Sequence, residues 1–347
     1  MVNGILSAPF LQAAGRAGTK KEIIYLQAEA ADINISNLSC NGEIVVESVK
    51  DGEPVVTKYR DLEFAHIVVN SDAESEVAIY GQVNRLMIDD ENVDLFSVDV
   101  TLAGSLKVLA IQEQTGITEL DLSANTELQE LFCDGCTGIT SLDLSANTKL
   151  QRLSCVRTGI TELDLSANTK LQRLSCEETG ITELDLSANT ELLDVFCGQT
   201  NITSLDLSVN TALQVLSCGQ TGITELDLSA NTELQELFCN GCTGITSLDL
   251  SANTKLQRLG CSSCDNLTNL NLETNAALID FSARYSTGLT SISYPATNSD
   301  VSTAIADAIT NADASDGTVY TDSAADYYST IADAATAKGW TIEQIQA

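Results

Sequence analysis

Cysteine is the residue type whose number and spacing in this sequence could do chemistry. The chain has eleven cysteines in 347 residues, and seven of them follow the same leucine pattern, as in LQRLSC, at intervals of 21 or 22 residues. These seven are Cys133, Cys155, Cys176, Cys197, Cys218, Cys239 and Cys261. Thiols placed this regularly could close disulfides, bind a metal, carry out redox chemistry or fill a hydrophobic core. The element that carries them decides between these uses.

The repeat that carries the cysteines extends from Ile111 to Ala283, which gives about nine coils of 21–22 residues. A fixed period of about 20–29 residues with leucines in an L-x-x-L-x-L-x-x-N/C-x-L frame is typical of leucine-rich repeats. In one coil, Cys176 takes the place of the last strand leucine and Thr179 that of the asparagine. The sequence therefore predicts a right-handed, mostly β, α/β-type repeat solenoid. Each coil contributes one short strand, stacked about 4.8 Å from the next.

A repeat array needs caps at its ends, because a terminal coil cannot bury its leucines alone. We expect the following organisation: residues 1–21 an extended basic arm, 22–105 a β-rich N-terminal cap, 106–294 the leucine-rich-repeat solenoid, and 295–347 an α/β C-terminal cap.

The two caps carry their own local signals. Asn41-Gly42 and Asp51-Gly52 are typical turn dipeptides in the N-terminal cap. In the C-terminal cap, the pattern predicts helices over 299–313 and 323–338, with Gly339 ending the second and the strand TVYT between them.

The geometry of stacked coils argues against disulfides between the seven periodic cysteines. Equivalent side chains in neighbouring coils are separated by the strand spacing of about 4.8 Å, whereas Cβ atoms of a relaxed disulfide lie about 3.8 Å apart. Seven is also an odd number, so the column could not pair completely. We therefore predict a ladder of buried thiols in which cysteine acts as a small hydrophobic residue.

Two metal-binding alternatives remain open at this stage. Cys239, Cys242, Cys261 and Cys264 match the spacing C-x2-C-x18-C-x2-C of a zinc site, although the repeat alone explains this spacing. An aspartate also recurs in every D-L-S-A-N segment, and stacked carboxylates could bind calcium or be satisfied by local hydrogen bonds. We favour the thiol ladder and the local hydrogen bonds, so no metal or cofactor is expected.

Composition excludes several classes of function. The formal net charge is −32, which excludes ordinary nucleic-acid binding. No apolar stretch is long enough to predict a membrane-spanning helix. With a single histidine, His66, and no phosphate-binding glycine loop, the sequence has no enzyme signature. We therefore expect a non-enzymatic protein.

Residues that flank the inward leucine and cysteine of each strand are expected to point outward on the concave side of the solenoid. They include exposed phenylalanines and a basic cluster, and both aromatic residues and arginine are enriched at binding hot spots. We therefore predict that a protein or glycan ligand binds this face. The candidate binding residues are Phe132, Arg152, Arg157, Arg173, Glu177, Glu178, Phe196 and Phe238.

The motif LxxLxCxxTGITELDLSANT resembles the cysteine-ladder leucine-rich repeats of bacterial surface proteins, namely internalin-type adhesins and leucine-rich proteins of gut Bacteroidetes and their phages. The resemblance covers about residues 106–292 and implies a curved, non-enzymatic scaffold that binds protein or glycan. The sequence departs from that family in two respects. Threonine replaces most of the asparagines after the cysteines, and the N-terminus is a poor signal peptide.

Two placements follow from this resemblance. The first is a virion-associated protein, such as a phage tail, fibre or decoration component, with residues 1–21 attaching it to an assembly partner. The alternative is an exported bacterial cell-surface adhesin of internalin type. Either would place the protein on a virion or cell surface, and neither involves membrane insertion.

The buried thiol ladder makes a direct prediction. Titration of the native protein with a thiol reagent should detect almost none of the eleven cysteines, and all eleven should react after denaturation. Reaction of several thiols in the native state, or fewer than eleven in the denatured and unreduced protein, would contradict this interpretation.

Overall fold

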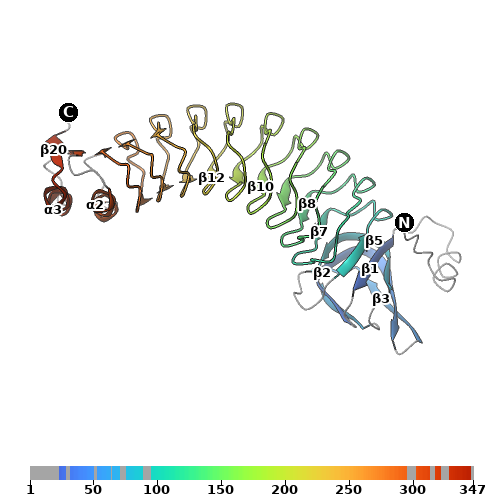
Figure 1. Cartoon of the computed structure of the whole chain (residues 1–347). Helices are drawn as coiled ribbons and strands as arrows, with labels where there is room; N and C mark the ends of the chain where they lie inside the picture. The colour runs from blue at the N-terminus through green and yellow to red at the C-terminus, as the bar shows by residue number, and fades with distance from the viewer. Residues whose placement is uncertain are drawn as a thin grey trace.

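In a computed structural model of the chain, the repeats form a curved solenoid with a β-rich unit at the N-terminal end and two helices at the C-terminal end (Figure 1). Helices are few and short, and no helix in the described part of the chain is long and apolar enough to cross a membrane. The structure describes residues 23–28, 32–50, 53–63, 65–70, 76–88, 95–294, 302–312, 317–321 and 328–344. The predicted N-terminal arm lies outside these residues.

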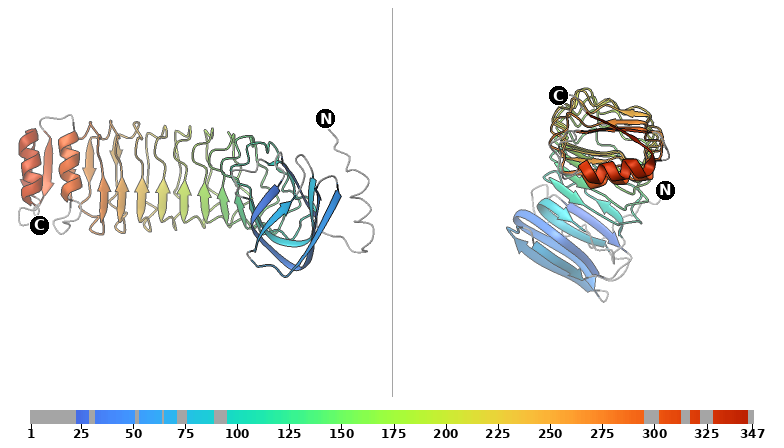
Figure 2. Two further views of the ribbon diagram at one scale, coloured as in Figure 1. Left: turned by 90° about the horizontal axis from the view of Figure 1, so that it is seen from below. Right: turned by 90° about the vertical axis from the view of Figure 1, so that its left-hand side faces the viewer.

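Each coil contributes a three-residue strand to a parallel sheet on the concave side of the arc (Figures 1 and 2). The strands pair in register, so that Arg173 lies opposite Arg152 on one side and Asp194 on the other. The strands are β7 (Val108–Ala110), β8 (Glu130–Phe132), β9 (Arg152–Ser154), β10 (Arg173–Ser175), β11 (Asp194–Phe196), β12 (Val215–Ser217), β13 (Glu236–Phe238), β15 (Arg258–Gly260) and β17 (Asp280–Ser282).

The repeat spacing explains this arrangement. The middle residue of each strand and the residue after the strand point inward, as Leu174 and Cys176 do, and both are completely buried. On the return segment, Ile181 and Leu186 are buried as well, so each coil packs its apolar side chains only against the coils above and below. The predicted leucine-rich-repeat solenoid is confirmed.

The N-terminal unit is joined to the solenoid by a shared sheet. The parallel pairing of β5 with β7 makes one sheet of 15 strands within the described residues. Asn41-Gly42 does not form the predicted turn. Both residues lie inside the long strand β2, where Gly42 has a φ of 78° and the register with β5 shifts. The strands of this unit are β1 (Ile23–Ala28), β2 (Asp32–Lys50), β3 (Glu53–Arg60), β4 (Ala65–Asn70), β5 (Glu76–Met87) and β6 (Leu95–Asp99).

A second parallel sheet runs along the return segments towards the C-terminus, in the order β14-β16-β18-β19-β20. The helices lie on the concave side, in line with the short strands (Figures 1 and 2). The C-terminal region therefore continues the winding for two turns, with a helix in place of each concave strand. The elements are β14 (Ser247–Leu248), β16 (Asn269–Asn271), β18 (Ser291–Ser293), α2 (Ser302–Asn311), β19 (Thr318–Thr321), α3 (Tyr328–Lys338) and β20 (Thr341–Gln344).

Helices α2 and α3 lie within the two predicted helical ranges, whose first residues fall outside the described part of the chain, and α2 ends at Asn311. Strand β20 was not predicted. The end of α3 follows the expected glycine signal. Gly339 has a φ of 82°, and the Trp340 amide donates to the carbonyl of Ala335, which closes the helix in a left-handed cap. Trp340 is then buried against Gly317, where an added Cβ would collide with its ring.

A column of buried asparagines ties each coil to the one before it. Asn189 is fully buried, and its Nδ2 donates to the carbonyl oxygens of Leu165 and Asn168 in the preceding coil at 3.0 and 2.9 Å. Equivalent pairs of hydrogen bonds recur at Asn125, Asn147, Asn168, Asn210, Asn231, Asn253 and Asn275.

The asparagine column predicts a large and local effect of truncation. Asn189→Ala removes two buried hydrogen bonds between coils, whereas the carbonyls of Leu165 and Asn168 each keep a backbone donor, so it should lower the free energy of unfolding by about 1–3 kcal/mol. Urea unfolding would measure the loss. Asn201→Ala is the matched control, because Asn201 is exposed and its backbone hydrogen bond survives the change. Equal destabilisation by the two variants would contradict the inter-coil role of the asparagine column.

Candidate binding surface

The seven periodic cysteines are buried in the solenoid core, as predicted. Their backbone amides continue the parallel pairing, and that of Cys176 donates to the Phe196 carbonyl at 2.8 Å. Burial raises the pKa of the Cys176 thiol to about 12 and raises those of Cys133, Cys155 and Cys197 well above the ordinary value. Because the thiolate is the reactive form, these buried, protonated thiols fill the core and are not nucleophiles.

A second inward column lies three residues after the ladder. In most coils it is threonine, and Thr179 donates its hydroxyl to the carbonyl of Cys176 at 2.7 Å. Cys242 and Cys264 occupy the same position, and their thiols lie 3.1 and 3.2 Å from carbonyl oxygens of the preceding coil. This column therefore satisfies backbone groups at the turn, which is the role that the repeat frame assigns to it.

The zinc alternative requires the thiols of Cys239, Cys242, Cys261 and Cys264 to converge. They instead interact diagonally between coils, and hydrogen bonds from the Cys218 thiol and from threonine lower the pKa of Cys242 to about 6. A bond from Cys239 lowers the pKa of Cys264 in the same way. No group of three or more His, Cys, Asp or Glu side chains within the described residues could hold a metal ion, so this alternative has no support.

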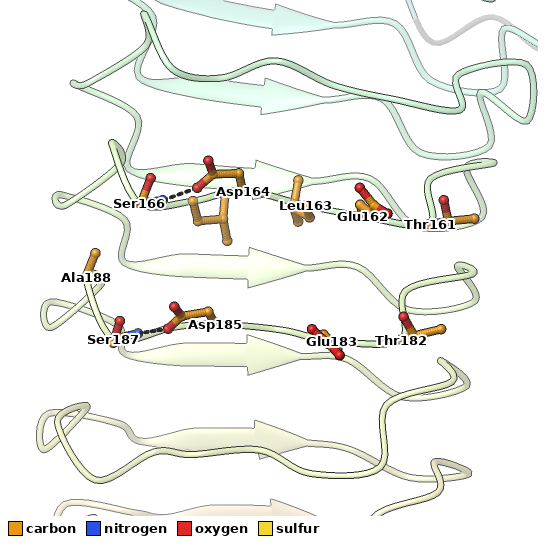
Figure 3. A pocket seen from close by; sticks show the side chains of 11 residues that line it. Thr161, Glu162, Leu163, Asp164, Ser166, Thr182, Glu183, Asp185, Ser187 and Ala188 are labelled. Carbon is orange, nitrogen blue, oxygen red and sulfur yellow. Dashed lines mark hydrogen bonds between the residues drawn. The ribbon is translucent and has the colours of Figure 1, made fainter.

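The aspartate column is held by local hydrogen bonds. Oδ1 of Asp185 accepts from the Ser187 amide at 2.9 Å, and the same contact recurs one coil away between Asp164 and Ser166 (Figure 3). The serine hydroxyl and amide together lower the pKa of Asp185. These residues line an open groove of about 460 Å³ on the return side. Their carboxylates accept hydrogen bonds within the turn, which is the alternative to calcium binding that the sequence favours.

The predicted binding residues fall into two groups on the concave side. One group points outward from the strands, and the other lies in the turns that follow them. Phe132, Arg152, Arg173, Phe196 and Phe238 lie on β8, β9, β10, β11 and β13, whereas Arg157, Glu177 and Glu178 follow β9 and β10.

The arginines of the predicted basic cluster are all paired with acidic side chains. Each of these arginines forms its ion pair with an acid of another coil, because opposite charges stand at equivalent positions in the repeat. The closest strand pair joins Arg173 Nε to Asp194 Oδ2 at 2.8 Å. Arg152 pairs with Glu130, and Arg157 pairs with Glu113 from two coils away. The expected positive patch is thus neutralised.

The phenylalanines are half-buried rather than fully exposed. Glu177 lies in the same region and reaches over Gly198 to accept a hydrogen bond from Ser217, two coils away, at 3.2 Å. Burial raises the pKa of its carboxyl group. The concave face therefore brings Phe196, Glu177 and Ser217 together, while Phe132 stands three strands away from Phe196.

Two features of this face were not predicted. Arg157 and Glu178 have left-handed backbone, with φ of 54° and 55°, at a turn position where another coil has Gly135. Leu193 and Val215 also lie on the concave side, at the start of β11 and β12, in columns that are otherwise mostly glutamine or charged. The glycine at an equivalent position and the breaks in the repeat pattern were the sequence signals for these features.

The duplicated coils provide a further observation about this face. Residues 115–155 and 221–261 differ only at Asp134/Asn240 and Ser154/Gly260. In the first copy, Ser154 donates its hydroxyl to Asp134. In the second, Gly260 lies directly against the Asn240 amide and the Phe238 ring. The two differences are therefore neighbours beside the concave phenylalanine.

The aspartate column predicts how stability depends on pH and calcium. Because folding lowers these pKa values, the stabilisation is present above the unfolded pKa of about 3.9 and is lost as the pH falls through the folded pKa. The melting temperature should therefore fall below about pH 4 and should not rise with calcium. Asp185→Asn should preserve the turn, as Asn271 does in its own coil, whereas Asp185→Ala should not. A calcium-dependent increase in melting temperature would contradict this assignment.

Comparison with known proteins supports the same architecture. The functional domain of InlJ from Listeria monocytogenes, described as including a cysteine ladder, is 31% identical over 64% of this chain, with a TM-score of 0.53. The alignment covers 52% of that structure, so the chain spans about half the length of the protein that it matches. No protein-family model and no curated protein matches the chain.

Two other solved structures from Listeria monocytogenes resemble it more distantly. Internalin C2 is 18% identical over 44% of this chain and 78% of its own, with a TM-score of 0.36. An internalin, inlF, is 16% identical over 76% and 87%, with a TM-score of 0.38. These two superpose too poorly to carry an argument. In its cysteine ladder and repeat geometry, this leucine-rich-repeat chain is therefore similar to the functional domain of InlJ.

Proposed function

We propose that the protein is a non-enzymatic binding scaffold of internalin type, which presents the concave sheet to a protein or glycan ligand. The observation that carries this proposal is the difference between the inward and outward positions of each coil. The inward positions repeat almost without change, whereas the outward positions of the concave strands alternate between aromatic, charged and small residues. Such a surface offers many side-chain combinations on a rigid backbone, which suits recognition.

A cell surface is the location that the InlJ likeness supports better than a virion. The virion-associated reading relied on residues 1–21 as an attachment arm, and these lie outside the described residues. We therefore propose the second placement, an exported cell-surface adhesin, in preference to a virion-associated protein. Protease treatment of intact producing cells tests this placement, since a surface protein is cleaved and a protein found only in purified virions is not.

Binding to arrays of extracellular proteins and glycans tests the function. Changing Phe132, Phe196 and Phe238 together to serine should weaken ligand binding by about tenfold or more, because half-buried aromatic anchors contribute about 2 kcal/mol or more to an interface. Serine already occupies this column at Ser154, Ser175 and Ser217, so the variant should keep its fold.

The matched control is Glu183→Ser on the return side, where another coil has Ser204. This variant should bind as the unchanged protein does. Equal loss in both variants, or no loss in the triple variant, would show that the concave sheet is not the binding face.

A further inference from the structure

The strongest departure from the repeat pattern lies in the middle of the concave sheet. The residue before each strand is glutamine in most coils but leucine at Leu193, and the first strand residue is charged in most coils but valine at Val215. The two are neighbours across the sheet, because the Val215 amide donates to the Leu193 carbonyl at 3.0 Å. Both side chains are half-buried, so part of each remains accessible.

The phenylalanines extend this apolar area. Phe196 and Phe238 lie opposite Ser217 from the two sides, so they are separated by two strand spacings, or about 10 Å. Gly260 stands beside Phe238, and a Cβ there would lie 3.0 Å from the ring. We define Leu193, Phe196, Val215 and Phe238 as the central patch.

The charged residues around the central patch differ in whether they form an ion pair. On its flanks, Arg173 is paired with Asp194, and Arg258 is paired with Glu236 at 2.9 Å. Glu177 differs, since its carboxylate lies over Gly198 with the Ser217 hydroxyl as its hydrogen-bond donor and with no ion pair among the described residues. A half-buried carboxylate beside an apolar area would gain most from a cation supplied by a ligand.

We propose that the central patch is the docking point for a protein segment that places an apolar side chain on Leu193 and Val215, alongside the two phenylalanines, and a lysine or arginine against Glu177. This inference rests on the proposed function and specifies the partner of the same face. A sugar would set hydroxyl groups against Leu193 and Val215, where they would find no hydrogen-bond partner, whereas an apolar side chain loses nothing there.

The net charge of the whole chain also indicates that the partner is basic. The formal net charge is −32, and the arginines on the flanks of the patch are already paired. Long-range attraction therefore favours a basic partner, and the rim of paired charges around an apolar centre resembles the organisation of a protein interface.

Selection from a display library of random twelve-residue peptides on the full chain tests the inference. The enriched peptides should carry an aromatic or large aliphatic residue within three positions of a lysine or arginine. Binding of a representative synthetic peptide should weaken by about tenfold or more in the double variant Leu193→Gln/Val215→Arg. These are the residues that the repeat itself uses at the two positions, so the fold should be retained.

Two further variants separate the parts of the site. Glu177→Gln should weaken the binding of the peptide and reduce the salt dependence of that binding. Ile279→Gln is the matched control, since Ile279 is 55% exposed in the same column as Leu193 but lies outside the central patch, and it should leave binding unchanged.

The inference is overturned if the enriched peptides lack the predicted pair of residues, or if Leu193→Gln/Val215→Arg binds them normally. It is also overturned if the unchanged protein binds only glycans or only a second copy of itself, as sedimentation would detect. If array binding is lost in the triple phenylalanine variant but kept in Leu193→Gln/Val215→Arg, the proposed function stands and the central patch is not its docking point.

Discussion

The fold depends on one constraint, which is that no coil can satisfy its own interior. Each coil leaves leucines on two open faces and backbone groups at the turn, and both are completed only by the next coil. The buried asparagine column makes this dependence specific. Asn189 donates to two carbonyls of the preceding coil, and the same pair of bonds recurs along the array. A shift of one coil relative to the next would break both of these buried hydrogen bonds, so register is fixed by hydrogen bonding as well as by packing.

The same constraint explains the cysteines. A side chain at the position after each strand must be apolar and able to stack on an identical residue, and a protonated thiol meets both requirements. The inward position of Cys176 raises its pKa and removes it from solvent, so its regular recurrence reflects packing. At the turn, Thr179 and Cys242 take equivalent positions, because either a hydroxyl or a thiol can reach a backbone carbonyl there.

Since the interior fixes the backbone, the outward positions can change at little cost. Glycines in one coil allow side chains of neighbouring coils to meet above it, as Glu177 does across Gly198 to reach Ser217. The two duplicated segments differ at only two positions, and these are neighbours beside Phe238. Variation in this chain is thus concentrated where a ligand could meet it, which connects the architecture to a recognition function.

The sequence by itself determined the solenoid, its period and the thiol ladder, because an identical spacing repeated along the chain admits few ways to bury the same side chains. It also placed Phe196 and Arg173 on the outward side of their strands, since residues alternate along a strand. Only the tertiary structure decided that Arg173 is neutralised by Asp194, that Glu177 contacts a serine 40 residues later, and that Leu193 and Val215 meet across the sheet. Such contacts depend on which side chains face each other between coils, a relation in space that the spacing within one coil does not contain.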